Sequence, residues 1–215
     1  MSDRFIITGV GHSGTGWCYK AMNWLGHACG HEWVYNFRPE HRWAGLRGDS
    51  AWPAAVLIDT FPATWPIAHL VRDPISVVTS LHTSGFTTKK LQDTPYMKYV
   101  RKRLPAMDEL NDDLVRAMAM VWMWNRVVEQ KCEDGRPMQR FRIEDISTEV
   151  SALRKFATFL TDFEPPRDEA AEVLEIIPRN YNSHKRGIVE WGQLPRGLWF
   201  DRLSEMATEY GYEVK

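Results

Sequence analysis

The sequence has few cysteines, no long apolar run and almost no net charge. Its cysteines, Cys18, Cys29 and Cys132, lack the spacing of a zinc site or a disulfide framework. We therefore expect no metal centre and a reducing, cytoplasmic location. We also expect no signal peptide and no membrane span, because no apolar stretch is long enough to cross a bilayer. The net charge of −1 favours neither nucleic acid nor an anionic membrane as a partner, so an anion site must be built locally.

The length and composition fit a globular α/β protein. The chain has 215 residues, of which 44% are hydrophobic and 12% aromatic, so it can fill a substantial core. This length predicts a single domain over residues 1–215. Its apolar pattern predicts strands alternating with helices, which indicates a mostly parallel sheet with helices on both faces. The expected strands are residues 5–10, 54–58, 67–71 and 138–143, and residues 28–37 form a short strand or extended loop.

The expected helices are separated by polar or irregular segments. Asn111 is the expected N-cap of a long helix that carries Trp122 and Trp124, both expected in the core. Residues 83–103 are basic and read as a loop or a mobile helix, and residues 38–52 and 178–197 read as irregular. The helices are expected at residues 14–25, 74–81, 112–134, 147–160, 169–177 and 199–210.

The organising stretch is residues 6–17, which read Ile-Ile-Thr-Gly-Val-Gly-His-Ser-Gly-Thr-Gly-Trp. A strand followed by a glycine-rich turn and a helix is typical of a phosphate cradle, because the glycines allow a close backbone approach. The first turn of the helix then directs N–H groups and the positive end of its dipole at an anion.

This cradle lacks the usual equipment of a nucleoside triphosphatase. The spacing from Gly9 to Gly14 resembles the start of a Walker loop, but Thr15 and Gly16 stand where that motif has lysine and a serine or threonine. The lysine that reaches terminal phosphates is therefore missing, and so is the hydroxyl that would hold magnesium.

Two further segments place anion-binding groups near strand ends. Arg72 follows the expected strand at residues 67–71, and Ser80 lies about two helical turns further on. A guanidinium and a hydroxyl at this separation can close on one phosphate. The second segment, residues 183–191, contains Lys185, Arg186 and Gly187, whose cations and backbone N–H groups can also wrap a phosphate.

Together these motifs resemble the sulfotransferases that use 3′-phosphoadenosine 5′-phosphosulfate (PAPS). Residues 12–17 are similar to that family's Lys-Ser-Gly-Thr-Thr-Trp loop, and residues 72–80 to its 3′-phosphate segment. Residues 142–146, Arg-Ile-Glu-Asp-Ile, resemble its Arg-Tyr-Glu-Asp-Leu run. Lys185, Arg186, Gly187 and Trp191 resemble its C-terminal Arg-Lys-Gly…Trp loop. The ordered motifs span most of the chain, and the resemblance implies a P-loop-type α/β fold that binds PAPS.

The resemblance also implies roles for individual residues. The loop residues would hold the 5′-phosphosulfate, Trp17 would stack on adenine, and Arg72, Ser80, Arg186 and Gly187 would bind the 3′-phosphate. The implied cofactor-binding set is Gly11, His12, Ser13, Gly14, Thr15, Gly16, Trp17, Arg72, Ser80, Lys185, Arg186 and Gly187.

Two positions in the loop depart from the family pattern. His12 stands where the family has lysine or arginine, and Gly16 stands where it has threonine or serine. We expect His12 to stabilise charge on the leaving oxygen. A histidine, with its ordinary pKa of about 6.5, can donate a hydrogen bond or carry the missing charge.

The acceptor hydroxyl needs a general base, and Glu32 is the first candidate. It lies in residues 31–37, a stretch that resembles the one supplying the base in glycan sulfotransferases; His82 and Asp59 are the alternatives. Trp33, Tyr35, Trp43 and Trp52 are candidates for lining an acceptor pocket, although packing explains some of them equally well.

The sequence therefore predicts a sulfotransferase that acts on a small-molecule or glycan acceptor without a metal. A P-loop kinase is the first alternative, and the missing Walker lysine argues against it. A nucleotide-binding module without turnover is the second, and His12 and Gly16 keep it open. The sequence indicates neither the acceptor nor the oligomeric state.

Overall fold

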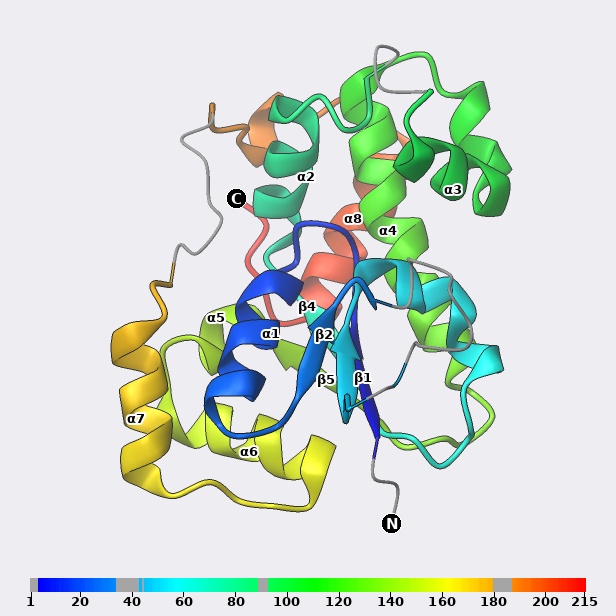
Figure 1. Ribbon diagram of the computed structural model, residues 1–215. Helices are drawn as coiled ribbons and strands as arrows, with labels where there is room; N and C mark the ends of the chain where they lie inside the picture. Colours follow the sequence, from blue (N-terminus) through cyan, green and yellow to red (C-terminus); the bar gives the residue numbers. More distant parts are fainter. Residues whose placement is uncertain (1–3, 34–42, 44, 89–92, 180–186) are drawn as a thin grey trace. The chain divides into compact units, whose positions relative to one another are not determined.

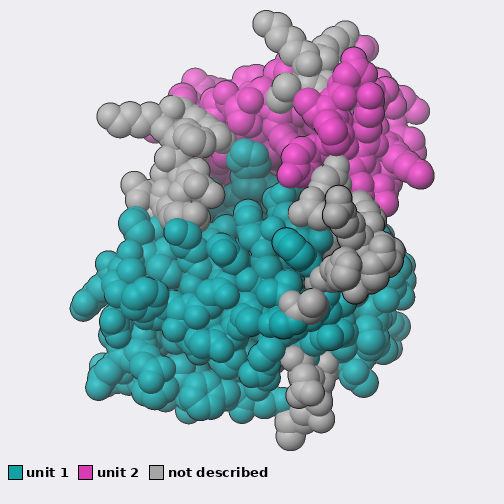
Figure 2. Space-filling view, in the orientation of Figure 1, with its two compact units in different colours: residues 1–72, 127–183 teal, residues 73–126, 184–215 magenta. Residues whose placement is uncertain are grey.

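The computed structural model describes residues 4–33, 43, 45–88, 93–179 and 187–215. Its backbone divides into two compact units (Figure 2), residues 1–72 with 127–183 and residues 73–126 with 184–215. The expectation of a single domain remains a prediction, and the two units are described separately. Within the described residues, no helix is both long and apolar enough to cross a membrane.

The first unit contains a five-stranded sheet in the order β2-β3-β1-β4-β5 (Figure 1). All of its pairings are parallel, which confirms the predicted α/β fold with a parallel sheet flanked by helices. The strands are β1 (Phe5–Thr8), β2 (Cys29–His31), β3 (Gly48–Ser50), β4 (Ile67–Val71) and β5 (Met138–Arg142).

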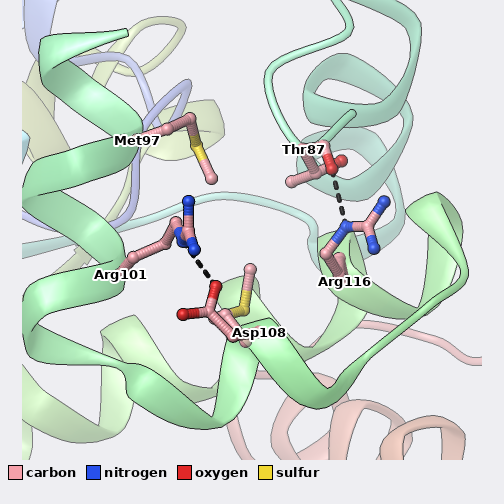
Figure 3. Close-up of a pocket in the computed structure, with 6 residues that line it drawn as sticks. Thr87, Met97, Arg101, Asp108 and Arg116 are labelled. Atoms are coloured by element: carbon pink, nitrogen blue, oxygen red, sulfur yellow. Dashed lines mark hydrogen bonds and ion pairs between the residues drawn. The ribbon is translucent and has the colours of Figure 1, made fainter. Parts of the chain in front are cut away.

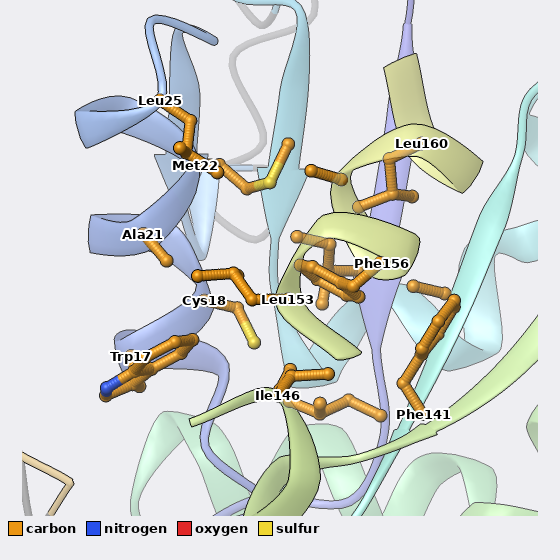
Figure 4. Close-up of a cluster of buried hydrophobic side chains, with 14 of the residues drawn as sticks. Trp17, Cys18, Ala21, Met22, Leu25, Phe141, Ile146, Leu153, Phe156 and Leu160 are labelled. Carbon is orange, nitrogen blue, oxygen red and sulfur yellow. The ribbon is translucent and has the colours of Figure 1, made fainter. Parts of the chain in front are cut away.

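Helices and a 3-10 segment accompany the sheet in this unit. They are α1 (Thr15–Trp24), η3 (Trp52–Thr60), α5 (Ile143–Ile146), α6 (Val150–Thr161) and α7 (Arg167–Ile176). A buried cluster joins α1 and α6 to the sheet, and Figure 4 shows Cys18 and Met22 of α1 facing Leu153 and Phe156 of α6. β1 and β4 are buried along their whole length, as expected for parallel strands covered on both faces.

Two consecutive elements, β3 and η3, differ from the sequence prediction. Residues 54–58 form part of η3, not a strand; an apolar run this short is ambiguous, and Pro53 suits a helical start. The strand that the sequence does not predict is β3, which lies within the segment at residues 38–52 that is expected to be irregular. It escapes detection because it is only Gly-Asp-Ser, although Gly48 is needed there: a Cβ at this position would overlap the Phe5 ring.

The second unit is mainly helical. It contains α2 (Pro74–Thr83), α3 (Pro95–Arg103), η5 (Pro105–Glu109), most of α4 (Asp113–Lys131), η6 (Trp191–Gln193) and α8 (Leu198–Glu209). The predicted N-cap of α4, Asn111, is wrong by one residue. Asp112 takes this role, because its Oδ1 accepts hydrogen bonds from the N–H groups of Leu114 and Val115 at 2.8 Å each. The basic segment at residues 83–103 ends in an ordered helix, α3, which Thr94 caps.

A buried arginine holds the start of α4 in this unit (Figure 3). Arg116 is 3% exposed; its Nε donates to the Thr87 carbonyl at 2.8 Å, and its guanidinium pairs with Asp113. Arg101 of α3 pairs with Asp108 at 2.5 Å across the same small cavity. Both arginines find their hydrogen-bond and ion-pair partners within this unit. Their role is therefore to hold α3, η5 and α4 together.

We predict that Phe156→Ala lowers the free energy of unfolding by about 3–5 kcal/mol. Phe156 is fully buried and packs edge-on against Phe141 with ring centroids 5.1 Å apart, so truncation removes apolar burial and leaves a cavity. Urea denaturation followed by circular dichroism measures the change. Ile176→Ala is the control: that side chain is 46% exposed and should change stability by less than about 0.5 kcal/mol. Equal losses in both variants would contradict this account of the core.

Candidate functional site

The candidate site lies at the carboxyl edge of the sheet in the first unit. Because all five strands are parallel, the segments that follow them emerge at the same edge. The loop at residues 9–14 follows β1, Glu32 follows β2, Arg72 follows β4 and Ile143 follows β5. β1 is the central strand, so its loop lies in the middle of this edge.

Glycines allow the loop to pack closely on its neighbours. A Cβ at Gly9 would overlap the carbonyl oxygen of Leu70 in β4. Gly14 has φ +106°, a conformation that L-residues rarely adopt, and a Cβ there would lie 2.6 Å from Ile143 Cγ1. The loop closes with a hydrogen bond from the Ser13 N–H to the Val10 carbonyl at 3.1 Å. Its path therefore requires glycine at both positions.

The N-terminus of α1 has the features of an anion site. Gly14 is its N-cap and supplies no side-chain acceptor, and the first turn contains no acidic residue. Among the residues that the structure describes, the N-cap of α1 thus offers no side-chain partner to the first N–H groups or to the positive end of the dipole. Ser13 is fully buried, and its Oγ has no hydrogen-bond partner within the described part of the chain. A buried hydroxyl in this position can donate to an anion bound in the loop.

Arg72 and the loop are brought together, as the sequence predicts. One Nη of Arg72 donates to the carbonyl oxygen of His12 at 3.2 Å. His12 has φ +70°, so the hydrogen bond from Arg72 helps to hold an uncommon left-handed backbone conformation at this residue. The guanidinium adds a permanent positive charge beside the uncapped helix.

Trp17 lies in the apolar core. Its side chain is 3% exposed and belongs to the buried cluster around α1 and α6 (Figure 4). The indole thus has no open face for a base in this conformation, and its role in adenine stacking remains a prediction.

Glu32 lies at the same sheet edge, in a turn after β2. It has φ +55°, which is uncommon for a glutamate, and its N–H donates to the Ser50 carbonyl at 3.2 Å. Ser50 in turn donates its hydroxyl to the Thr15 carbonyl at 2.7 Å. A hydrogen-bonded path through β3 thus joins the candidate base to α1. Trp33 follows Glu32 and is 44% exposed, and its N–H is held by Asp49 Oδ1 at 3.2 Å.

Other predicted site residues belong to the second unit or lie outside the described residues. Ser80 is on α2. Gly187 lies beside the same helix, where a Cβ would sit 3.8 Å from Thr83 Cγ2. Thr79 Oγ1 donates to the Val189 carbonyl at 3.3 Å and accepts its N–H at 3.2 Å. Lys185 and Arg186 lie outside the described residues.

Several other sequence candidates have structural roles. Asp59 does not end a strand; it lies in η3 and pairs with Lys131.

Two of the tryptophans that are candidates for an acceptor pocket also have packing roles. Trp52 is 5% exposed beside Gly11, and its carbonyl accepts the Thr8 hydroxyl at 3.4 Å. Trp43 packs on Phe61 and Trp65, whereas Tyr35 lies outside the described residues. In α4, Trp124 is fully buried, and Trp122 is half-buried against Arg202.

The thiols take no part in this site. Burial raises the pKa of Cys18, and burial together with the charge of Asp49 raises that of Cys29 well above its usual value. Burial also raises the pKa of Cys132 to about 11. All three thiols therefore stay protonated near neutral pH and are poor nucleophiles.

Sequence comparison adds no relative to this description. Neither the models of known protein families nor the curated proteins include a match to this chain. Within the described residues, no group of three or more histidine, cysteine or acidic side chains is placed to hold a metal ion.

We predict that Gly14→Ala destabilises the protein by more than Gly26→Ala. Both glycines have positive φ, +106° and +80°, so alanine at either costs about 1–2 kcal/mol in backbone conformation. Only Gly14 has a neighbour in the way, Ile143, whereas Gly26 has open space around its Cβ position. Thermal or urea unfolding of both variants measures the difference. Equal destabilisation would contradict the close packing of the loop on Ile143.

Proposed function

We propose that this protein transfers a sulfuryl group from PAPS to a hydroxyl or amine acceptor. The observation that carries the proposal is the anion cradle in the first unit, in which the buried Ser13 hydroxyl, the uncapped start of α1 and Arg72 meet at one loop. The Ser13 hydroxyl and the start of α1 fit a phosphosulfate and Arg72 fits the 3′-phosphate, while the loop lacks the lysine and hydroxyl of a Walker motif. The ordered sequence motifs support PAPS over other anionic nucleotides.

The reaction assigns a separate task to each group. When bound, PAPS supplies an activated sulfuryl group, and its transfer leaves adenosine 3′,5′-bisphosphate. The loop N–H groups and Ser13 bind oxygens of the phosphosulfate, and Arg72 binds the 3′-phosphate. His12 donates a hydrogen bond to the leaving oxygen, on which negative charge develops. Glu32 accepts the proton of the acceptor hydroxyl.

Backbone geometry supports His12 and Glu32 as the reacting side chains. In the part of the chain that the structure describes, the non-glycine residues with positive φ are His12, Glu32 and Asp162. Asp162 simply ends α6 as its C-cap, whereas the other two lie at the carboxyl edge of the sheet. Unfavourable backbone conformations concentrate at functional sites, where surrounding contacts hold them.

Ligand binding is the first test of the proposal. We expect adenosine 3′,5′-bisphosphate to raise the melting temperature without added metal and ATP with magnesium to raise it less. Arg72→Ala should weaken bisphosphate binding about 10- to 100-fold, because a hydrogen bond to a charged group contributes about 1.5–3 kcal/mol. Isothermal titration calorimetry measures the affinity.

Arg154→Ala is the matched control for Arg72→Ala. Arg154 is an arginine of the same unit that pairs with Glu164 at 2.9 Å, so its loss should leave the affinity unchanged. Magnesium-dependent binding of ATP in preference to the bisphosphate would favour the kinase alternative. Bisphosphate binding without sulfuryl transfer to any of a panel of acceptors would favour the non-catalytic module.

We also predict that His12 and Glu32 act on different parts of sulfuryl transfer. His12→Ala should lower the rate, because the leaving oxygen loses its hydrogen-bond donor, and His12→Lys should restore it, because lysine places a cation at the same position. Glu32→Gln should lower the rate about 10²- to 10⁴-fold, because an amide does not accept the proton of the acceptor hydroxyl.

Transfer from radiolabelled PAPS to an acceptor from the panel measures these rates. Glu144→Gln is the control for the lost carboxylate, since Glu144 lies in α5 of the same unit and is not assigned to the reaction. Wild-type turnover in His12→Ala would exclude His12 as the stabiliser of the leaving oxygen. An unchanged rate in Glu32→Gln would exclude Glu32 as the base.

A further inference from the structure

Ser50, the last residue of β3, contacts both halves of the candidate site. It is fully buried, and its hydroxyl donates to the carbonyl of Thr15, the first residue of α1, at 2.7 Å. Its own carbonyl accepts the N–H of Glu32 at 3.2 Å. One residue thus touches the helix turn of the anion loop and the turn that carries the candidate base.

The strand register places Ser50 between the strands that lead to these two segments. In the parallel ladders it is the partner of Ile7 in β1 and of His31 in β2. β1 continues into the anion loop, and β2 continues directly into Glu32. A change in the position of either segment therefore acts on the same short strand.

Asp49 strengthens the hold on the Glu32 turn. This residue is also fully buried, and its Oδ1 accepts the Trp33 N–H at 3.2 Å. Two consecutive N–H groups, those of Glu32 and Trp33, are thus bonded to two consecutive residues of β3. This double attachment holds the left-handed conformation of Glu32.

We propose that Ser50 is a positioning residue that couples the anion loop to the Glu32 turn. When a doubly phosphorylated nucleoside binds in the loop, the effect of binding reaches the Glu32 backbone through the Ser50 hydroxyl. The base is therefore held in position when the donor nucleotide is bound. This inference rests on the proposed function, because it assigns the ligand of the loop. A purely structural Ser50 would affect stability without transmitting the effect of a ligand.

The test follows backbone amide hydrogen exchange by NMR, with adenosine 3′,5′-bisphosphate as the probe. In the wild-type protein, we expect saturating bisphosphate to slow exchange at residues 15–17 and at Glu32 and Trp33. In Ser50→Ala, the bisphosphate should bind up to about tenfold more weakly. It should still slow exchange in the loop segment but no longer at Glu32 and Trp33.

Two further variants make the comparison specific. Thr158→Ala is the matched control, because Thr158 Oγ1 also donates to a backbone carbonyl, that of Arg154 at 2.8 Å, but lies on α6. It should respond to the bisphosphate like the wild type. Ser50→Thr keeps the hydroxyl donor and should restore slowed exchange at Glu32. Ser50→Cys, with a weak donor of similar size, replaces Ser50→Ala if the alanine variant does not fold.

The outcomes separate this inference from the proposed function. If Ser50→Ala binds the bisphosphate and slows Glu32 exchange as the wild type does, the coupling is refuted and the proposed function stands. If the wild type does not bind the bisphosphate, the proposed function fails, and so does the ligand-driven coupling. The unliganded proteins then show whether Ser50 positions the two segments: faster exchange at both in Ser50→Ala supports that role, and unchanged exchange overturns it.

Discussion

The loop after β1 has no room for a side chain where it passes the end of β4. A Cβ on Gly9 would overlap the Leu70 carbonyl, and one on Gly14 would meet Ile143 at 2.6 Å. Because the backbone is held this closely between β4 and α5, α1 must start directly behind the loop. The buried Ser13 hydroxyl and the first N–H groups of α1 therefore follow one another directly along this loop. The proposed anion site therefore follows from how closely the loop packs on the sheet.

Several strands of the sheet in this unit carry fully buried polar residues. Thr8, Asp49, Ser50 and His69 are all fully buried, in β1, β3 and β4. Burying a polar side chain costs free energy unless it is hydrogen-bonded, and Ser50 and Asp49 bond to backbone groups of α1 and of the turn after β2. The apolar residues of β1 and β4 stabilise the sheet, whereas Asp49 and Ser50 of β3 hold the segments that follow β2 and β1.

The sequence predicts the parts of the fold in which pattern and chemistry coincide. Continuous apolar runs identify β1 and β4, and Pro74 marks the start of α2. The glycine pattern and Arg72 mark the proposed anion loop, and in the structure Arg72 is bonded to that loop through the His12 carbonyl. β3 cannot be predicted in this way, because Gly-Asp-Ser has neither β-branched residues nor alternation. Its position depends on Phe5, which lies over Gly48 and is distant in sequence.

The contrast between local sequence pattern and long-range contacts also applies to the residues of the proposed site. His12 and Glu32 stand out through a motif, but their left-handed backbones depend on tertiary hydrogen bonds from Arg72 and to Ser50. Trp17 matches a motif equally well, yet its apolar surface packs into the core with Cys18 and Met22. A motif therefore indicates which chemical groups are present, whereas non-local contacts determine which of them face the site. Ser50 is the converse case: no motif marks it, and only the register of β3 with β1 and β2 places it between the loop and Glu32.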